Sequence, residues 1–161
     1  MSTAAAIAKH PIHPMLVVFP IGLWIFSLIN DLVLVTGLRT TLWNDLAFYT
    51  MAGGLVGALL AAIPGFFDLL STSDSKVWKI GVYHLILNFM VIAIFTVNLY
   101  RRATSLPGDP LPIALSILGV ILLAVSGWLG GEMVNVCGTG VQPPPRRRST
   151  ENQQPPRDRL R

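Results

Sequence analysis

The side chains of this sequence best suited to bind a metal ion are its histidines and two of its carboxylates. Two histidines stand in the segment His10-Pro11-Ile12-His13-Pro14, directly before a long apolar stretch, and the third lies inside a later apolar stretch. Neutral imidazole is a good ligand for zinc, iron and copper, and carboxylates can complete the coordination shell. The candidate ligands of a metal ion are His10, His13, His84, Asp68 and Glu132.

Four apolar segments must position these side chains. Hydrophobic residues make up 52% of the 161 residues and charged residues only 12%, below the charged fraction of an ordinary soluble protein. A helix needs roughly 20 residues to cross a hydrocarbon core of about 30 Å. The segments of that length are, approximately, Met15–Val35, Leu46–Leu70, Val77–Tyr100 and Leu111–Val134. Because the connections are short, we expect an all-α fold, a four-transmembrane-helix antiparallel bundle within residues 10–141.

The antiparallel arrangement brings the candidate ligands to one membrane face. His10 and His13 precede the first segment, and Asp68 closes the second. His84 lies about two turns into the third segment, and Glu132 lies near the end of the fourth. Residues near helix ends are also where charged groups are cheapest to keep in a membrane. The sequence therefore indicates a polar site at this face without fixing its chemistry.

A haem would need one imidazole on each side of the porphyrin, from different helices at matched depth. His13 and His84 form the best such pair and are the candidate cofactor ligands. Three histidines are too few for two bis-histidine haems, so one haem per chain is the upper limit. Glycines at a similar level either leave room for a flat ring or mark close helix contacts: Gly65, Gly81, Gly127 and Gly130.

Two patterns predict how the helices pack. Small residues recur every four positions in the second segment, which lets another helix approach closely in lipid: Gly53, Gly57, Ala61 and Gly65. In the third segment, residues spaced by three and four place polar groups on one face that should point into the bundle: His84, Asn88, Val91, Phe95 and Asn98. Asn88 is expected to orient the His84 ring or to bond a neighbouring helix. The bland alternative is that His84 and Asn88 only hold helices together.

Both termini are predicted to lie in the cytoplasm, because Lys and Arg in short flanks stay there during insertion. One side has Lys9, Lys76, Lys79 and the run Arg146-Arg147-Arg148, and the other has Arg39, Arg101 and Arg102, six residues against three. Residues 1–9 are interpreted as a short leader. Residues 142–161, rich in Pro, Arg and Gln, are expected to be a disordered basic tail that meets anionic lipid or a partner.

Two other function classes find little support. No serine stands in a nucleophile-elbow or Ser-x-x-Lys setting, so nucleophilic hydrolysis finds little support, and the catalytic residues of any enzymatic activity are unknown. The strong basic cluster lies in the tail and not on a folded surface, so no nucleic-acid partner is expected.

Several of these residues resemble a known family. The motifs are His-Pro-x-His-Pro at the start of the first segment, His84 with Asn88, and the stretch from Ser126 to Glu132. Together they are similar to the bacterial membrane family catalogued as domain of unknown function 2231. The resemblance covers about residues 11–141 and implies a four-helix inner-membrane protein without an established activity, distantly similar in architecture to membrane b-type cytochromes. Val18 stands where that pattern has a further histidine, which removes one intramembrane ligand.

Two functions from different classes remain open. In the first, the protein binds haem b or a transition metal ion at its cytoplasmic membrane end and transfers electrons to or from a redox partner. In the second, it is a structural or interaction protein without a cofactor, whose partners are the lipid bilayer, another protein or a second copy of the chain. Only the first predicts a Soret band or stoichiometric metal in the purified protein.

Overall fold

The computed structural model describes residues 6–7, 10–37, 41–104 and 109–141. The predictions for the tail at 142–161 and for most of the leader at 1–9 lie outside these residues. Within the leader, β1 (Ala6–Ile7) pairs antiparallel with β2 (His10–Pro11), Ala6 opposite Pro11 and Ile7 opposite His10. The chain therefore makes a short hairpin immediately before the first helix.

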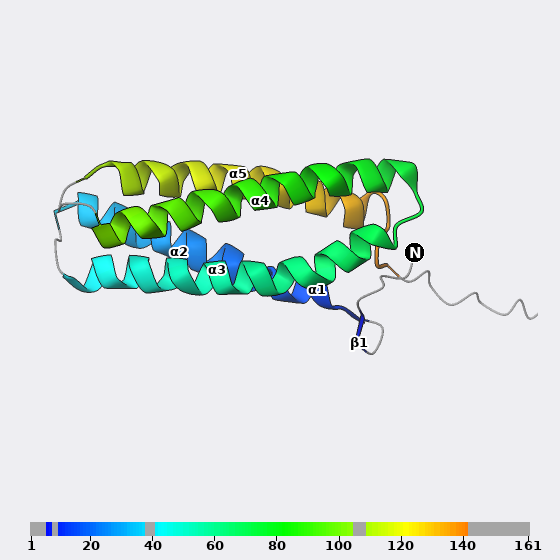
Figure 1. The fold of residues 1–161 in the computed structure, drawn as a ribbon, viewed down its shortest axis with the longest axis horizontal. Helices are drawn as coiled ribbons and strands as arrows, with labels where there is room; N and C mark the ends of the chain where they lie inside the picture. Colours follow the sequence, from blue (N-terminus) through cyan, green and yellow to red (C-terminus); the bar gives the residue numbers. More distant parts are fainter. Residues whose placement is uncertain (1–5, 8–9, 38–40, 105–108, 142–161) are drawn as a thin grey trace, which may run out of the picture.

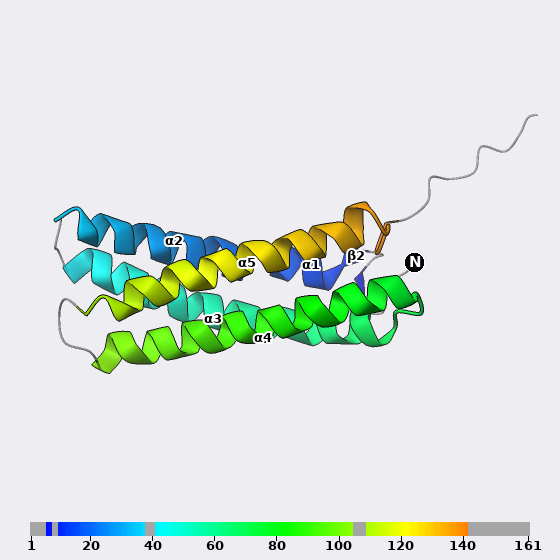
Figure 2. The ribbon, with the colours of Figure 1, turned by 90° about the horizontal axis from the view of Figure 1, so that it is seen from above.

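The expected all-α bundle is confirmed. The helices are α1 (Ile12–Leu16), α2 (Val18–Val35), α3 (Thr41–Leu70), α4 (Ser75–Thr104) and α5 (Leu111–Asn135). Within the described residues, four helical segments are long and apolar enough to cross a membrane, with α1 and α2 together forming the first. These segments lie side by side along the long axis of the molecule, and α1 lies at the same end as the connection from α3 to α4 (Figures 1 and 2). Helix α3 begins five residues before the apolar segment predicted from the sequence, because backbone hydrogen bonding continues through polar residues.

The break between α1 and α2 has a local cause. Pro20 has no N–H to donate to the carbonyl of Leu16, so the helical ladder loses a bond at this point. The structure interrupts the helix at Val17, whose N–H still bonds the carbonyl of His13 at 3.1 Å. The interruption thus lies three residues before Pro20, and α1 remains a separate short helix that carries His13.

The bundle is built from two tight antiparallel pairs. Helix α2 makes its most extensive contacts with α3, and α4 makes its most extensive contacts with α5. The contacts of α3 with α4 and of α2 with α5 are less extensive, and α1 packs against α3. A seam therefore runs between the α2/α3 pair, extended by α1, and the α4/α5 pair.

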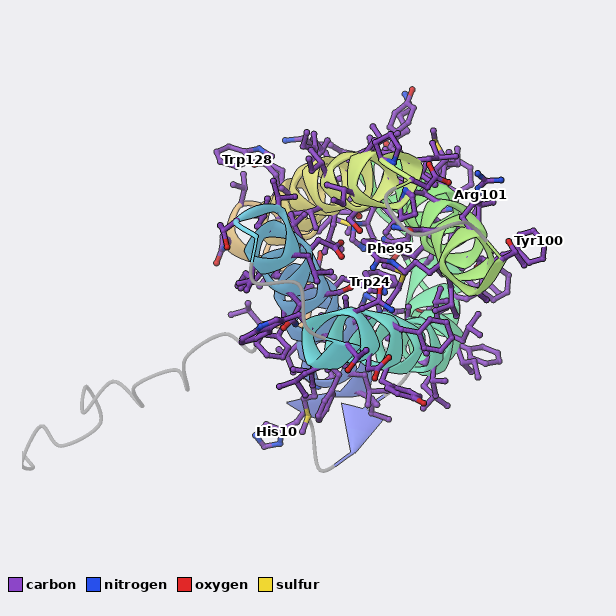
Figure 3. All side chains as sticks on the ribbon, turned by 90° about the vertical axis from the view of Figure 1, so that its left-hand side faces the viewer. His10, Trp24, Phe95, Tyr100, Arg101 and Trp128 are labelled. Carbon is purple, nitrogen blue, oxygen red and sulfur yellow. The ribbon has the colours of Figure 1, made fainter. Side chains whose placement is uncertain are left out.

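The middle of the bundle is closed by an apolar cluster. Its buried members are Trp24, Met51, Val91, Phe95 and Leu123. The rings of Trp24 and Phe95 stack across the seam with centroids 4.3 Å apart, and the indole N–H donates to the carbonyl of Met51 at 3.3 Å. Seen from the end formed by the α2–α3 and α4–α5 connections, both rings lie between the helices, whereas Trp128 and Tyr100 lie on the outside (Figure 3). Outward apolar side chains of this kind suit contact with lipid.

The small-residue stripe of α3 packs against α1 and α2, as its spacing predicted. A Cβ at Gly54 would lie 2.5 Å from the indole nitrogen of Trp24, and one at Gly57 would lie 3.1 Å from Pro20. Ala61, between them and Gly65, is buried. The stripe thus receives side chains of the preceding helices directly on the α3 backbone.

We expect Gly54→Ala to destabilise the protein by about 1–3 kcal/mol, because the added methyl group must displace the fully buried Trp24 ring. Gly22→Ala is the matched control, since Gly22 is exposed in the interior of α2 and a Cβ there meets nothing within 4 Å. In thermal unfolding experiments in detergent, only Gly54→Ala should show a lower unfolding midpoint than the parent protein. Equal midpoints for both variants would show that the indole does not need this close approach.

Candidate functional site

The structure places His13 and His84 next to each other across the seam. Their ring centroids are 6.2 Å apart and the ring planes are nearly perpendicular, at 88°. His13 comes from α1, and His84 comes from α4, two turns and a half from its N-terminal end. Both side chains are half-buried. The two histidines that the sequence indicated as candidate cofactor ligands therefore lie next to each other in the structure.

The ring of His13 is fixed to the backbone of α3. Its Nδ1 lies 2.7 Å from the carbonyl oxygen of Ala61. The carbonyl can only accept, so this ring nitrogen carries the proton and donates it. Gly65 makes the approach possible, since a Cβ there would lie 2.6 Å from the same nitrogen. The small residues of α3 thus provide both the acceptor and the space for this ring.

The ring of His84 is fixed in the same way to α5. Its Nδ1 lies 2.9 Å from the carbonyl oxygen of Ser126 and 3.1 Å from the hydroxyl of the same residue. A Cβ at Gly130 would lie 3.4 Å from Cε1 of the ring. Asn88 donates to the main-chain carbonyl of His84 at 2.8 Å. Asn88 was expected to orient the His84 ring or to bond a neighbouring helix. Its hydrogen bond goes instead to the backbone of its own helix.

Both rings use Nδ1 as the donor, which determines what the other nitrogen can do. In a neutral imidazole whose Nδ1 is protonated, Nε2 carries the lone pair and can bind a metal ion. Histidines that bind metals commonly donate their other N–H to a backbone carbonyl or carboxylate, which fixes the tautomer and the ring orientation. Two imidazoles that bind one ion from opposite sides at about 2.0–2.1 Å have ring centroids about 6 Å apart. The centroids of the His13 and His84 rings lie 6.2 Å apart, close to this distance.

The other predicted ligands lie at the same end of the bundle. Asp68 is in the last turn of α3, where Ser71 and Thr72 donate to its main-chain carbonyl. Glu132 is in the last turn of α5, and His10 is exposed on β2, at the outer edge of the bundle in Figure 3. Over residues 10–37, 41–104 and 109–141, no three or more His, Cys, Asp and Glu side chains form a group that could hold a metal ion. The described site consists of the two imidazoles.

Most of the glycines near the depth of the two histidines lie against side chains of other helices. Gly65 and Gly130 receive the two histidine rings, and Gly81 receives Leu69, whose Cδ1 lies 2.6 Å from the Cβ position. Gly127 is exposed, and a Cβ there would meet nothing within 4 Å. Three of these four glycines therefore lie in contact with a side chain of another helix, and only Gly127 has open space at its Cβ position.

We expect Gly65→Ala to displace the His13 ring from the Ala61 carbonyl and to lower stability by about 1–3 kcal/mol. The measurement is thermal unfolding in detergent of this variant beside Gly127→Ala, which adds the same methyl group at an open position. Gly127→Ala should melt like the parent. A normal melting temperature for Gly65→Ala would mean that the ring is not held as described.

A second polar cluster, which the sequence analysis missed, lies at the opposite end. Arg102 of α4 forms a buried ion pair with Asp31 of α2, with side-chain exposures of 6% and 1%. Ser116 of α5 donates to the same carboxylate oxygen at 2.8 Å, and Asn98 donates to Ser116 at 2.9 Å. The available signal was a carboxylate before the end of the first apolar segment and an arginine just after the third. Asn98 itself was correctly placed on the inward face of its helix.

The family model described as Predicted membrane protein (DUF2231) matches residues 9–143. No curated protein and no solved structure matches the chain.

Proposed function

Because the chain belongs to the family of predicted membrane proteins described as DUF2231, we propose a function within the bilayer. His13 and His84 hold one metal centre between them, the iron of a haem b or a single transition metal ion, and the protein takes part in electron transfer. The observation that supports this proposal is that each ring is anchored through Nδ1 to a different helix pair, with the ring centroids 6.2 Å apart.

The donor chemistry of the site suits such a centre. Imidazole nitrogens are ligands for iron, copper and zinc alike, and haem iron is commonly held by histidine. When bound, iron or copper would supply a one-electron couple. The protein's own part is to fix the two rings, to keep Nδ1 protonated on both, and to surround the site with apolar helices. Glu132 and Asp68 are proposed as supporting carboxylates at this membrane face, and His10 as an alternative ligand.

The competing proposal is a structural role without a cofactor. It rests on the same hydrogen bonds, since His13 already joins α1 to α3 and His84 already joins α4 to α5. Interhelical hydrogen bonds of this kind contribute about 1 kcal/mol each in membranes. In that case the histidines would stabilise the bundle, and the surfaces that face lipid or another protein would carry the function.

A visible absorption spectrum of the detergent-purified protein, before and after dithionite and combined with elemental analysis, separates these proposals. A Soret band with a reduced α band and about one haem per chain supports haem b. A flat spectrum with stoichiometric copper, iron or zinc keeps the histidine ligands without a porphyrin. A flat spectrum without metal contradicts the cofactor proposal and leaves the structural one.

We further propose that the protein lies in a bacterial plasma membrane with both termini in the cytoplasm. The positive-inside count placed Arg102 among the three cations of the opposite side. Its side chain is buried in an ion pair within the bundle, so it does not act as a free cation of that side and does not count against this orientation. Single cysteines in a Cys137→Ser background test it: Ser73→Cys, in the α3–α4 connection, should react only after permeabilisation. Asn44→Cys, in the first turn of α3, should react with an impermeant reagent in intact cells. The reverse pattern would invert the topology.

A further inference from the structure

The buried cluster at the end opposite the histidines contains acceptor atoms that its own donors do not reach. We propose that Asn30 and Asp31 line a binding site for water inside the membrane-spanning bundle, hydrated from the adjacent membrane face. The site is separate from the histidine pair, and the proposal does not depend on the cofactor.

The donors of the cluster all converge on one oxygen of Asp31. Oδ2 accepts from the guanidinium of Arg102 and from the hydroxyl of Ser116. The guanidinium donates further to Ser116 at 3.2 Å and, through Nε, to Asn98 at 3.2 Å. The amide of Asn98 donates to Ser116 and to the carbonyl of Pro112, both at 2.9 Å. These hydrogen bonds of Arg102, Ser116 and Asn98 thus reach acceptors within this network, the Pro112 carbonyl and Oδ2 of Asp31, and none reaches Oδ1 of Asp31.

Two acceptors beside this network are left without a donor. Oδ1 of Asp31 and Oδ1 of Asn30 are buried and have no hydrogen-bond partner among the described residues. Both residues have 0% of their surface exposed. The amide nitrogen of Asn30 donates to the carbonyl of Phe26 at 2.7 Å, so its oxygen is the atom that still lacks a partner. Buried polar groups are nearly always hydrogen-bonded to protein or to ordered water.

The chemistry of these atoms selects the ligand. Both are acceptors, so the ligand must donate hydrogen bonds or carry positive charge. The charges of Asp31 and Arg102 cancel each other within the ion pair. A bound metal cation would therefore leave a net positive charge beside a guanidinium in a low-dielectric interior. Water donates two hydrogen bonds without adding charge and commonly bridges buried polar groups. Water therefore fits this site better than sodium or potassium.

The position of the cluster gives water a short route from one side only. Asp31 lies four residues before the end of α2, and Arg102 lies two residues before the end of α4. Towards the middle of the bundle, the stacked rings of Trp24 and Phe95 lie between the helices (Figure 3). In the proposed arrangement, water reaches Asn30 and Asp31 from this end of the bundle and not through the apolar cluster at its centre.

Cysteine accessibility tests the route. In a Cys137→Ser background, Ser116→Cys places a near-isosteric thiol within the network, and Leu123→Cys places one in the apolar cluster two turns further along α5. A small uncharged reagent, methyl methanethiosulfonate, should modify Ser116→Cys at least tenfold faster than Leu123→Cys in folded protein. Equal, slow rates would overturn the proposal.

A second measurement does not depend on a reactive thiol. If water satisfies the Asn30 oxygen, Asn30→Leu removes those hydrogen bonds and should lower the melting temperature; if the site is dry, leucine removes an unsatisfied acceptor and should raise it. Thr50→Val is the matched control, because it loses a side-chain bond to a carbonyl four residues earlier, as Asn30→Leu does. A melting temperature for Asn30→Leu at or above that of Thr50→Val overturns the proposal.

The choice of water over a cation has its own test. Replacing sodium chloride by N-methylglucamine chloride should leave the melting temperature of the parent protein unchanged. Stabilisation by sodium that is lost in Asn30→Leu would assign the site to a metal cation and overturn the proposal.

Discussion

His84→Ala is expected to abolish cofactor retention, with less than a tenth of the parental haem or metal content after purification. The described site has two imidazoles, and no other His, Cys, Asp or Glu side chains join them in a group of three among the residues that the structure places. Loss of one ligand therefore halves the coordination that the protein supplies. The bundle should persist, since the lost hydrogen bond to Ser126 contributes only about 1 kcal/mol.

His10→Ala is the control for this experiment. His10 is exposed on β2, so its variant should keep most of the cofactor. Haem content from the pyridine haemochrome spectrum and metal content by elemental analysis provide the measurement, with circular dichroism to show that both variants are folded. Equal cofactor content in the parent and in the His84 variant would refute the assignment of His84 as a ligand.

Arg102→Ala should destabilise the protein strongly, by about 3–5 kcal/mol. The substitution leaves the Asp31 carboxylate buried without its counter-ion and also removes bonds to Asn98 and Ser116. In the double variant Asp31→Leu with Arg102→Met, both charges are replaced by apolar groups of similar volume. We expect this double variant to recover most of the stability, because neutralising both partners removes the desolvation cost together with the attraction.

Arg101→Ala supplies the matched control for the ion pair. Arg101 pairs with Asp109 at 2.7 Å, but 40% of its side chain is exposed, and such surface pairs contribute about 0–1 kcal/mol. Unfolding midpoints in detergent should rank Arg102→Ala far below Arg101→Ala. If both variants unfold at similar midpoints, or if the double variant is no more stable than Arg102→Ala, the buried pair does not hold the bundle in the way described.

The sequence by itself determined the number of membrane-spanning segments and their antiparallel order. Segment length follows from the thickness of the bilayer, and order follows from short connections, so both are local properties. Helical periodicity likewise placed Val91, Phe95 and Asn98 on an inward face, and all three are fully buried. The glycine spacing of the second segment correctly indicated a packing surface.

The pairing of His13 with His84 could be proposed from the sequence because both lie at matched depth near one membrane face. The carbonyl groups to which the two rings are hydrogen-bonded could not be predicted from the sequence. Each ring binds a main-chain carbonyl, of Ala61 and of Ser126, and every residue carries such a group, so composition and spacing give no signal for which one is used. The same reason explains why Asn88 was expected to meet a side chain and instead bonds the backbone of its own helix.

Only the tertiary structure decided which charges meet inside the bundle. By its position after the third apolar segment, Arg102 was expected to be a flanking cation, but the structure buries it against Asp31, 71 residues earlier in the chain. Helical rotation alone allows either residue to face lipid, water or a partner. The large free-energy cost of burying a single charge requires that both turn inward together, and this coupling exists only once α2, α4 and α5 are packed.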